Sequence, residues 1–267
     1  MKIKRYQVDA FTNTLFAGNP AAVCVVDEPL ADSLMQAIAA ENNLAETAFV
    51  LGSGGEYEIC WFTPVCEVDL CGHATLASAH ALMTGEGVGE DVIRFNSRQR
   101  GSLIVTKRNT FYELDFPRTG FARQSVDESL AKSVSQSPVE YWSAGEDSLL
   151  VYSDSDAVAH LRVDCGRLAD LKYRALMVTS VGQDCDFVSR FFAPSLGINE
   201  DAVTGSAHTV LAPFWSERLN KKKMAARQLS KRGGELTCEV VEDRVLIGGE
   251  AVTYSTGTIQ ISTPTPD

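Results

Sequence analysis

The chain has 267 residues, 45% of them hydrophobic, which is enough to bury one large core or two cores of roughly 100–150 residues each. The formal net charge is −11 with only 24 Lys and Arg residues, so nucleic acid and anionic membrane surfaces are excluded as expected partners. No apolar stretch approaches the ~20 residues that cross a bilayer, and the N-terminus lacks the apolar region of a signal peptide. We therefore expect a cytoplasmic protein with no membrane partner.

Short segments typical of β-strands recur along the whole chain. Many alternate apolar and polar residues, as expected of a strand with one solvated face, and glycine or charged residues separate several of them. The predicted strands are 5–11, 22–26, 47–51, 57–62, 103–106, 111–116, 148–152, 158–163, 175–180, 236–241, 244–247 and 257–261.

Helical patterns are few. They cover 31–43, 73–84 and 206–219, and a weaker pattern covers 126–134. A β-rich chain with few helices indicates an α+β protein and not a doubly wound α/β protein.

The seven cysteines lie at irregular spacings and form no Cys-x-x-Cys pair. This pattern disfavours a structural zinc site, and a reducing compartment favours free thiols, so we expect no metal. Cys71 differs from the others in its neighbours, because a glycine, a histidine and a run of small and apolar residues follow it in 69-DLCGHATLASAHAL-82.

An internal repeat relates two parts of the chain. The segments 61-WFTPVCEVDLCGHATLASA-79 and 191-FFAPSLGINEDAVTGSAHTVLA-212 each have two aromatic residues, a proline after one further residue, a short acidic loop and a glycine before a small-residue helix. When Gly72 and Gly205 are aligned, Cys71 lies opposite Thr204.

The repeat predicts two similar β-rich halves. The first, 1–118, has the central helix 73–84, and the second, 119–267, has the central helix 206–219. We expect an active-site cleft between them, and a terminal strand can pair across to the first half.

Gly72 and Gly205 would each allow a tight turn into a helix. The first N–H groups of a helix lack partners within it, and the helix dipole adds positive charge there. Such a helix start binds carboxylate or phosphate, so the pair predicts a small carboxylate substrate. The alternative is that these glycines only terminate loops.

Polar residues lie around both turns. His73 can hydrogen-bond a substrate or cap the helix, and Asp201 can bind a substrate amine or fix its loop. Ser206 offers a hydroxyl and a backbone N–H. His208 is a weaker candidate, and we interpret His80 as a packing or surface residue.

Glu46 is the candidate acid/base. It stands where a helix ends and a strand begins, among apolar residues, and apolar surroundings disfavour an ionised carboxylate. The alternative is a glutamate that points to solvent.

Five segments together resemble the phenazine biosynthesis PhzF-like family. They are 9-DAFTNTLFAGNPAAV-23, 44-LAETAFV-50, 62-FTPVCEVDLCGHATLASAH-80, 186-DFVSRFFAPSLGINEDAVTGSAH-208 and 228-QLSKRGGEL-236, and they span nearly the whole chain. The resemblance implies a diaminopimelate-epimerase-like α+β fold with two pseudo-symmetric halves, each a curved, barrel-like sheet around a central helix. It also implies a homodimer that needs neither a metal nor an organic cofactor.

For function, the resemblance implies an isomerase that moves a proton between carbons of a small carboxylate. By matching motifs, Glu46 is the general acid/base, and His73, Asp201 and Ser206 are supporting site residues beside the turns at Gly72 and Gly205. The family usually has proline where this chain has Ala202, which should loosen the loop that carries Asp201.

The resemblance also bears on Cys71. Epimerases of this fold use two opposed thiols, and here the two positions hold Cys71 and Thr204, whose hydroxyl is too weak an acid for that role. A one-thiol amino-acid epimerase or dehydratase that uses Cys71 therefore stays open. A non-catalytic metabolite-binding protein is the other alternative.

Overall fold

The structure is a computed structural model that describes residues 1–261. The chain divides into two units by its internal contacts. Among the described residues, unit 1 comprises 1–16, 20–114 and 249–261, and unit 2 comprises 17–19 and 115–248. The C-terminal strand therefore belongs with the N-terminal unit, and a three-residue N-terminal segment belongs with the second unit.

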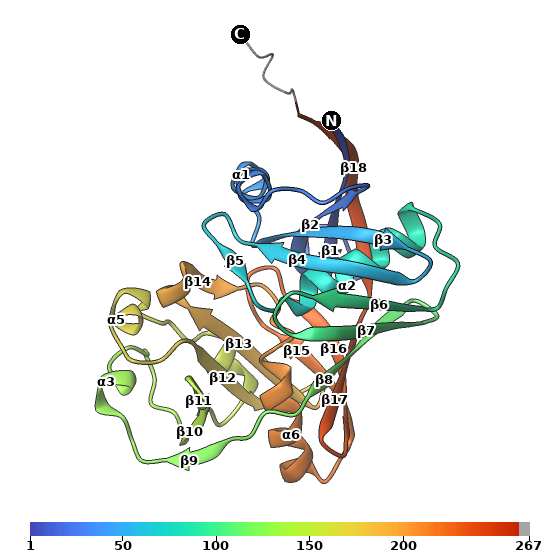
Figure 1. Cartoon of the computed structure of the whole chain (residues 1–267). Coiled ribbons are helices and arrows are strands. Elements are labelled where there is room, and N and C mark those ends of the chain that lie inside the picture. Colours follow the sequence, from blue (N-terminus) through green and yellow to red (C-terminus); the bar gives the residue numbers. More distant parts are fainter. Residues whose placement is uncertain (262–267) are drawn as a thin grey trace. The chain divides into compact units, whose positions relative to one another are not determined.

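Unit 1 holds most of the first half of the chain (Figure 1). Its elements are β1 (Lys2–Ala10), β2 (Asn19–Val26), α1 (Asp32–Asn42), β3 (Glu46–Ser53), β4 (Glu56–Phe62), β5 (Glu67–Val68), α2 (Gly72–His80), the π-helical turn η1 (Ala81–Gly85), β6 (Val92–Ser97), β7 (Gly101–Arg108), β8 (Phe111–Pro117) and β18 (Ala251–Gln260).

Unit 2 holds most of the second half of the chain. Its elements are β9 (Ala122–Gln124), α3 (Glu128–Ala131), β10 (Glu140–Ala144), β11 (Asp147–Val151), α4 (Ser155–Ala159), α5 (Cys165–Ala169), β12 (Leu176–Val181), β13 (Phe187–Ala193), the 3₁₀ turn η2 (Pro194–Leu196), β14 (Ile198–Asp201), α6 (His208–Leu219), β15 (Lys223–Gln228), β16 (Gly234–Val241) and β17 (Arg244–Gly249).

The strand pairing of the two units matches position by position. In unit 1 the hydrogen-bonded order is β18-β1-β2-β3-β4-β6-β7-β8, with the short β5 also on β4. In unit 2 the order is β9-β10-β11-β12-β13-β15-β16-β17, with the short β14 also on β13. The parallel pairs also correspond, because β2–β3 and β4–β6 match β11–β12 and β13–β15. The α+β fold of two related halves predicted from the sequence is confirmed.

The sheet of unit 1 curves around α2. This helix contacts β1, β3, β7 and β18, which come from distant positions in the strand order, and all nine of its residues are buried. Its sequence, GHATLASAH, consists mainly of small residues, which allow strands to approach on every side. In unit 2, α6 is buried from His208 to Trp215 and contacts β15 and β16.

The two central helices differ slightly from their predicted bounds. The predicted 73–84 helix is α2 followed by a π-helical turn that ends at Gly85. The predicted 206–219 helix begins at His208, because its first turn is tighter than an α-helix. There the N–H groups of His208 and Thr209 donate to the carbonyls of Gly205 and Ser206, three residues back.

The prediction of a strand over 158–163 was wrong. This segment is the end of α4 and the loop that follows. The side chain of Asp154 accepts a hydrogen bond from the N–H of Ala157 and caps the helix. Val158 and Leu161, three residues apart, both pack into the core of unit 2, which is a helix-like spacing that the sequence reading took for strand alternation.

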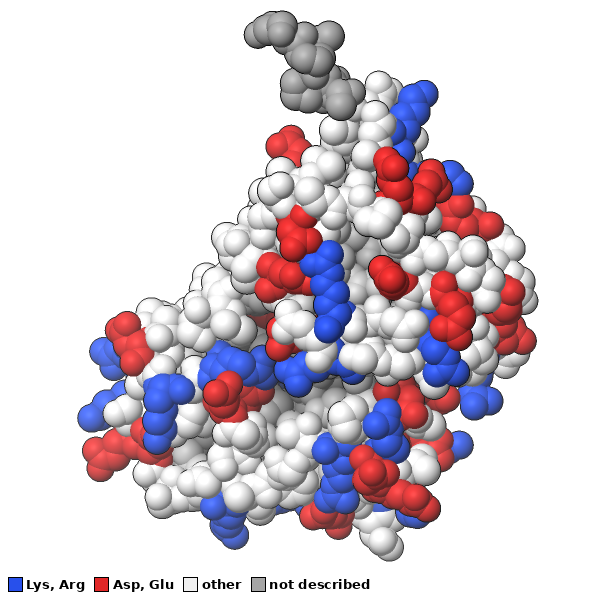
Figure 2. Space-filling model, in the orientation of Figure 1, with Lys and Arg blue, Asp and Glu red and all other residues white. Residues whose placement is uncertain are grey.

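The surface carries charged side chains of both signs (Figure 2). On the face drawn in Figure 2, basic and acidic side chains are interspersed. Arg98, for example, lies 2.9 Å from a carboxylate oxygen of Asp32 and 3.4 Å from one of Glu67. No helix among residues 1–261 is long and apolar enough to cross a bilayer.

The turn after α2 gives a test of core packing. A Cβ atom at position 85 would lie 2.4 Å from Cε1 of Tyr6, whose hydroxyl donates to Glu86 and holds the ring in place. We expect Gly85→Ala to lower the free energy of unfolding by about 1–3 kcal/mol through overpacking. Urea unfolding measures this, with Gly89→Ala as the matched control, because no described atom lies within 4 Å of a Cβ there. Equal stability of the two variants would contradict this packing.

Candidate active site

Glu46 is the first residue of β3, directly after the turn that ends α1. Asn43 ends that helix in the left-handed conformation (φ 47°) and turns the chain towards the sheet. Glu46 then pairs with Ala21 on the parallel strand β2, and the buried run from Ala48 to Val50 holds the strand in the core. The carboxylate is thus placed by a rigid strand.

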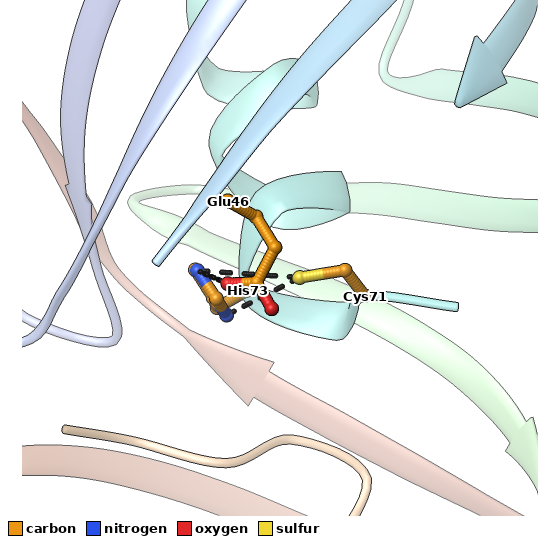
Figure 3. Close-up of side chains that lie close together, drawn as sticks. All are labelled: Glu46, Cys71 and His73. Atoms are coloured by element: carbon orange, nitrogen blue, oxygen red, sulfur yellow. Dashed lines mark hydrogen bonds and ion pairs between the residues drawn. The ribbon is translucent and has the colours of Figure 1, made fainter. Parts of the chain in front are cut away.

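Glu46 meets Cys71 and His73, from the start of α2 (Figure 3). Nε2 of His73 lies 3.3 Å from Oε2 of Glu46. Nδ1 of the same ring lies 3.4 Å from Sγ of Cys71, and Nε2 lies 4.0 Å from that sulfur. We call these three residues the Glu-Cys-His cluster.

The cluster is buried. Glu46 is 9% exposed, Cys71 6% and His73 5%. Burial lowers the pKa of His73 to about 3, so its imidazole is neutral at pH 7. A neutral imidazole carries one N–H, and the 3.4 Å contact allows the Cys71 thiol to donate to Nδ1, which would put the ring N–H on Nε2, 3.3 Å from Oε2 of Glu46.

A second polar group lies in unit 2, at the loop between β14 and α6. Nδ2 of Asn19 donates to Oδ1 of Asp201 at 2.8 Å and to the carbonyl of Val203 at 2.8 Å. The Thr204 hydroxyl donates to the other carboxylate oxygen of Asp201. Gln228 accepts from the N–H of Thr204 at 2.9 Å and donates to the carbonyl of Asp201 at 2.9 Å. We call Asn19, Asp201, Thr204 and Gln228 the Asp201 network.

The network fixes the loop in which alanine replaces the family's usual proline. The carbonyl of Ala202 accepts a hydrogen bond of 2.6 Å from the Ser230 hydroxyl. Together with the two backbone contacts of Gln228, this bond restrains the loop from both ends. The expected loosening at Ala202 is therefore opposed by side-chain hydrogen bonds.

The remaining predicted site residues lie beside these groups. Gly72 is the buried first residue of α2, and Gly205 is buried in the turn before α6. Neither is among the described glycines with positive φ, so no left-handed turn requires glycine at either position. Ser206 is exposed, and its carbonyl accepts a 2.8 Å hydrogen bond from the Thr209 hydroxyl.

Two other histidines have structural partners. His80 is buried, with Nδ1 3.1 Å from the Tyr112 hydroxyl and Nε2 2.9 Å from that of Thr253, so its interpretation as a packing residue is confirmed. His208 is fully buried, and its Nδ1 lies 2.8 Å from the carbonyl of Thr204. Through this contact His208 supports the end of the Asp201 loop.

Sequence reasoning missed Asn19 and Gln228 as site residues. Both lie inside segments that carry the family resemblance, 9-DAFTNTLFAGNPAAV-23 and 228-QLSKRGGEL-236. Arg232, from the second of these, donates to the carbonyls of Ala17 and Gly18 at 2.8 Å each. These bonds attach residues 17–19 to unit 2 and bring Asn19 to Asp201. The signal that could have identified them is an amide side chain, Asn or Gln, inside each of these two segments.

Comparison with known proteins agrees with the fold and the motifs. The family model of the phenazine biosynthesis-like proteins (PhzC-PhzF) matches residues 8–257. Two Pseudomonas aeruginosa proteins, each named an uncharacterized isomerase, are 44% identical over 98% of this chain and 100% of their own length. A mouse phenazine biosynthesis-like domain-containing protein is 39% identical over 97% of this chain and 99% of its own.

The solved structures give the same result. A PhzF-family protein of Enterococcus faecalis has a TM-score of 0.94 and 44% identity over 98% of this chain and 100% of that one. A hydroxyproline epimerase of Agrobacterium vitis has the same fold, with a TM-score of 0.61, 11% identity and coverage of 98% and 94% of the two chains. The fold is thus that of the diaminopimelate-epimerase-like proteins. Within this class, the chain belongs to the phenazine biosynthesis-like (PhzC-PhzF) family.

The Asp201 network predicts a pH-dependent stability. Burial, opposed by hydrogen bonds from Thr204 and Asn19, raises the pKa of Asp201 to about 6 from 3.8. Folding therefore favours the protonated acid, and this contribution is complete below about pH 4 and lost as the pH rises through about 6. It amounts to no more than about 3 kcal/mol.

We expect Asp201→Asn, which cannot ionise, to lack this loss of stability between pH 4 and pH 7. Urea unfolding at several pH values measures it, with the exposed Asp184→Asn as the control that keeps the wild-type slope. A wild-type slope in Asp201→Asn would show that this carboxyl does not titrate as described.

Proposed function

We propose that the protein is an isomerase of a small carboxylate substrate, and that Glu46 moves a proton between two of its carbons. The observation that carries this proposal is the buried carboxylate of Glu46, whose Oε2 lies 3.3 Å from Nε2 of a neutral imidazole, His73. The names of the closely similar bacterial relatives, which are called isomerases, support the reaction class.

The step needs a base that becomes an acid. The Glu46 carboxylate accepts a proton from one substrate carbon, and the electron pair of the broken C–H bond moves into the adjacent unsaturated system. The carboxylic acid exchanges this proton with solvent and then protonates a different carbon. Substrate and product thus have the same atoms and charge, and no organic cofactor or metal takes part.

His73 positions the base. Nε2 of His73 lies 3.3 Å from Oε2 of Glu46, and this contact restrains the orientation of the carboxylate, while Nδ1 contacts the thiol of Cys71. Because the ring is neutral, it directs Glu46 without placing a full positive charge beside it. His73 can also hydrogen-bond the substrate once Glu46 is protonated.

The substrate carboxylate is assigned to helix starts. The first N–H groups of α2 lie beside the Glu-Cys-His cluster, and a helix start of this kind favours an anion. Gly72 presents no side chain there, so an anion can approach the backbone closely. Gly205, Ser206 and Asp201 are proposed as further substrate-binding residues, Asp201 for an amino group.

Three features expected from the sequence remain predictions: a cleft shared by the two halves, a homodimer and a cytoplasmic location.

A one-thiol reaction at Cys71 is the second candidate. The observation that favours it is the 3.4 Å contact between Sγ and Nδ1 of His73, through which a neutral imidazole can remove the thiol proton. In that reaction Cys71 is the base towards carbon and Glu46 only orients His73.

Glu46→Gln tests the first candidate. Glutamine keeps the shape of the side chain and removes its basicity, so we expect solvent-deuterium incorporation into the substrate to fall by roughly 10²–10⁴-fold. The measurement is a mass-spectrometric screen of cyclic and amino-bearing carboxylic acids in deuterated water. Glu58→Gln, on the exposed side of β4, is the control that keeps full exchange. Undiminished exchange in Glu46→Gln would refute the proposal, and saturable binding without any exchange would indicate a binding protein.

Cys71→Ala separates the two candidates. If Glu46 is the base, exchange in Cys71→Ala falls less than about 10-fold, since only the support of His73 is lost. If Cys71 is the base, exchange is abolished in Cys71→Ala, while Glu46→Gln keeps most of it. The same assay, run on both variants with matched protein concentration, decides between them.

A further inference from the structure

The Glu-Cys-His cluster presents three different metal-binding atoms to one point. A thiol sulfur, an imidazole nitrogen and a carboxylate oxygen lie within 4.8 Å of one another. All three residues are buried and held by α2 or by the strand β3, so the atoms converge without help from a mobile loop (Figure 3). The geometry points to a site for a divalent transition metal such as Zn²⁺, with Glu46, Cys71 and His73 as its ligands.

Two of the separations are close to those of zinc ligands. Ideal tetrahedral bonds place a sulfur and a nitrogen ligand about 3.6 Å apart, and a nitrogen and an oxygen ligand about 3.4 Å apart. Nε2 of His73 lies 4.0 Å from Sγ of Cys71 and 3.3 Å from Oε2 of Glu46. Because Sγ lies closer to Nδ1, at 3.4 Å, the imidazole ring has to turn on binding so that the lone pair of Nε2 points at the ion.

The ligand types select the metal. Thiolate and imidazole favour Zn²⁺ and Co²⁺ over Mg²⁺ and Ca²⁺, which prefer oxygen ligands. On binding, the Cys71 thiol releases its proton to solvent and the imidazole proton moves to Nδ1, which leaves Nε2 free to coordinate. Three protein ligands leave the fourth position of a tetrahedral ion open for water.

The metal would act as an inhibitor and not as a cofactor. A bound ion takes the lone pair of Glu46 that the proposed reaction needs for a proton, and it takes Nε2 of His73 as well. The proposed metal binding does not depend on the proposed function. The proposed inhibition does rest on it, because it requires Glu46 to be the base. We therefore expect reversible inhibition of deuterium exchange that a chelator relieves.

Cobalt gives a direct test of binding. The reduced, chelator-treated protein is titrated with Co²⁺ alone, and absorbance is recorded in the near ultraviolet and the visible. We expect one saturable site with a thiolate-to-cobalt charge-transfer band and the visible bands of tetrahedral cobalt. One equivalent of Zn²⁺ should remove both sets of bands. Absence of a saturable one-to-one site would overturn the assignment.

Variants identify the ligands. In Cys71→Ala the charge-transfer band should vanish and affinity should fall by at least about 100-fold, since even outer-shell partners typically contribute 10–100-fold. Cys66→Ala removes an exposed thiol of the same unit and should change neither. A band that persists in Cys71→Ala, or that disappears in Cys66→Ala, would assign the metal elsewhere and reject the site.

Two measurements keep the result separate from folding and from the proposed function. Circular dichroism checks each variant, and Cys71→Ser replaces Cys71→Ala should the alanine variant unfold, with the same loss of the sulfur band expected. Deuterium exchange is measured on metal-free protein. If exchange in the metal-free protein does not need Glu46, the proposed function fails and the cobalt result stands. If exchange needs Glu46 but Co²⁺ does not bind, only the metal site is rejected.

Discussion

The complete enclosure of α2 by its own sheet is the constraint on which the rest of unit 1 depends. All nine residues of the helix are buried, and strands from distant positions in the sheet pack against it. The sides of α2 are therefore covered by strands, which leaves the first turn as the part of the helix that can bind a ligand. The Glu-Cys-His cluster lies at that first turn because β3 begins there and brings Glu46 to it.

The corresponding place in unit 2 is built from the same topology with different chemistry. Thr204 occupies the position that aligns with Cys71, and its hydroxyl donates to Asp201 while its N–H donates to Gln228. Both polar groups of the residue thus hold the loop. An alcohol fixed in this way cannot replace a second thiol, so the proposed base lies on one side only, at Glu46.

The sequence predicted what local patterns encode. Alternation and small-residue helices located most strands and both central helices, and the repeat around Gly72 and Gly205 predicted two related halves. Contacts between residues far apart in the chain could not be predicted from local patterns. Asn19, for example, reaches Asp201 across 182 residues. No metal site was expected from the sequence, because the cysteines form no Cys-x-x-Cys pair, and the proposed ligands Glu46 and Cys71 are 25 residues apart.

One arrangement of atoms explains both the catalytic proposal and the metal proposal. A base that works on carbon must be buried and aimed, and the proposed base Glu46 lies 3.3 Å from one nitrogen of a neutral imidazole whose other nitrogen contacts a thiol. The same requirements bring sulfur, nitrogen and oxygen lone pairs together in a small volume, which is what a zinc ion recognises. A serine at position 71 could set the tautomer with far less affinity for zinc. In these two proposals the thiol couples the aiming of Glu46 to sensitivity towards soft metals, so the two proposed properties have one structural cause.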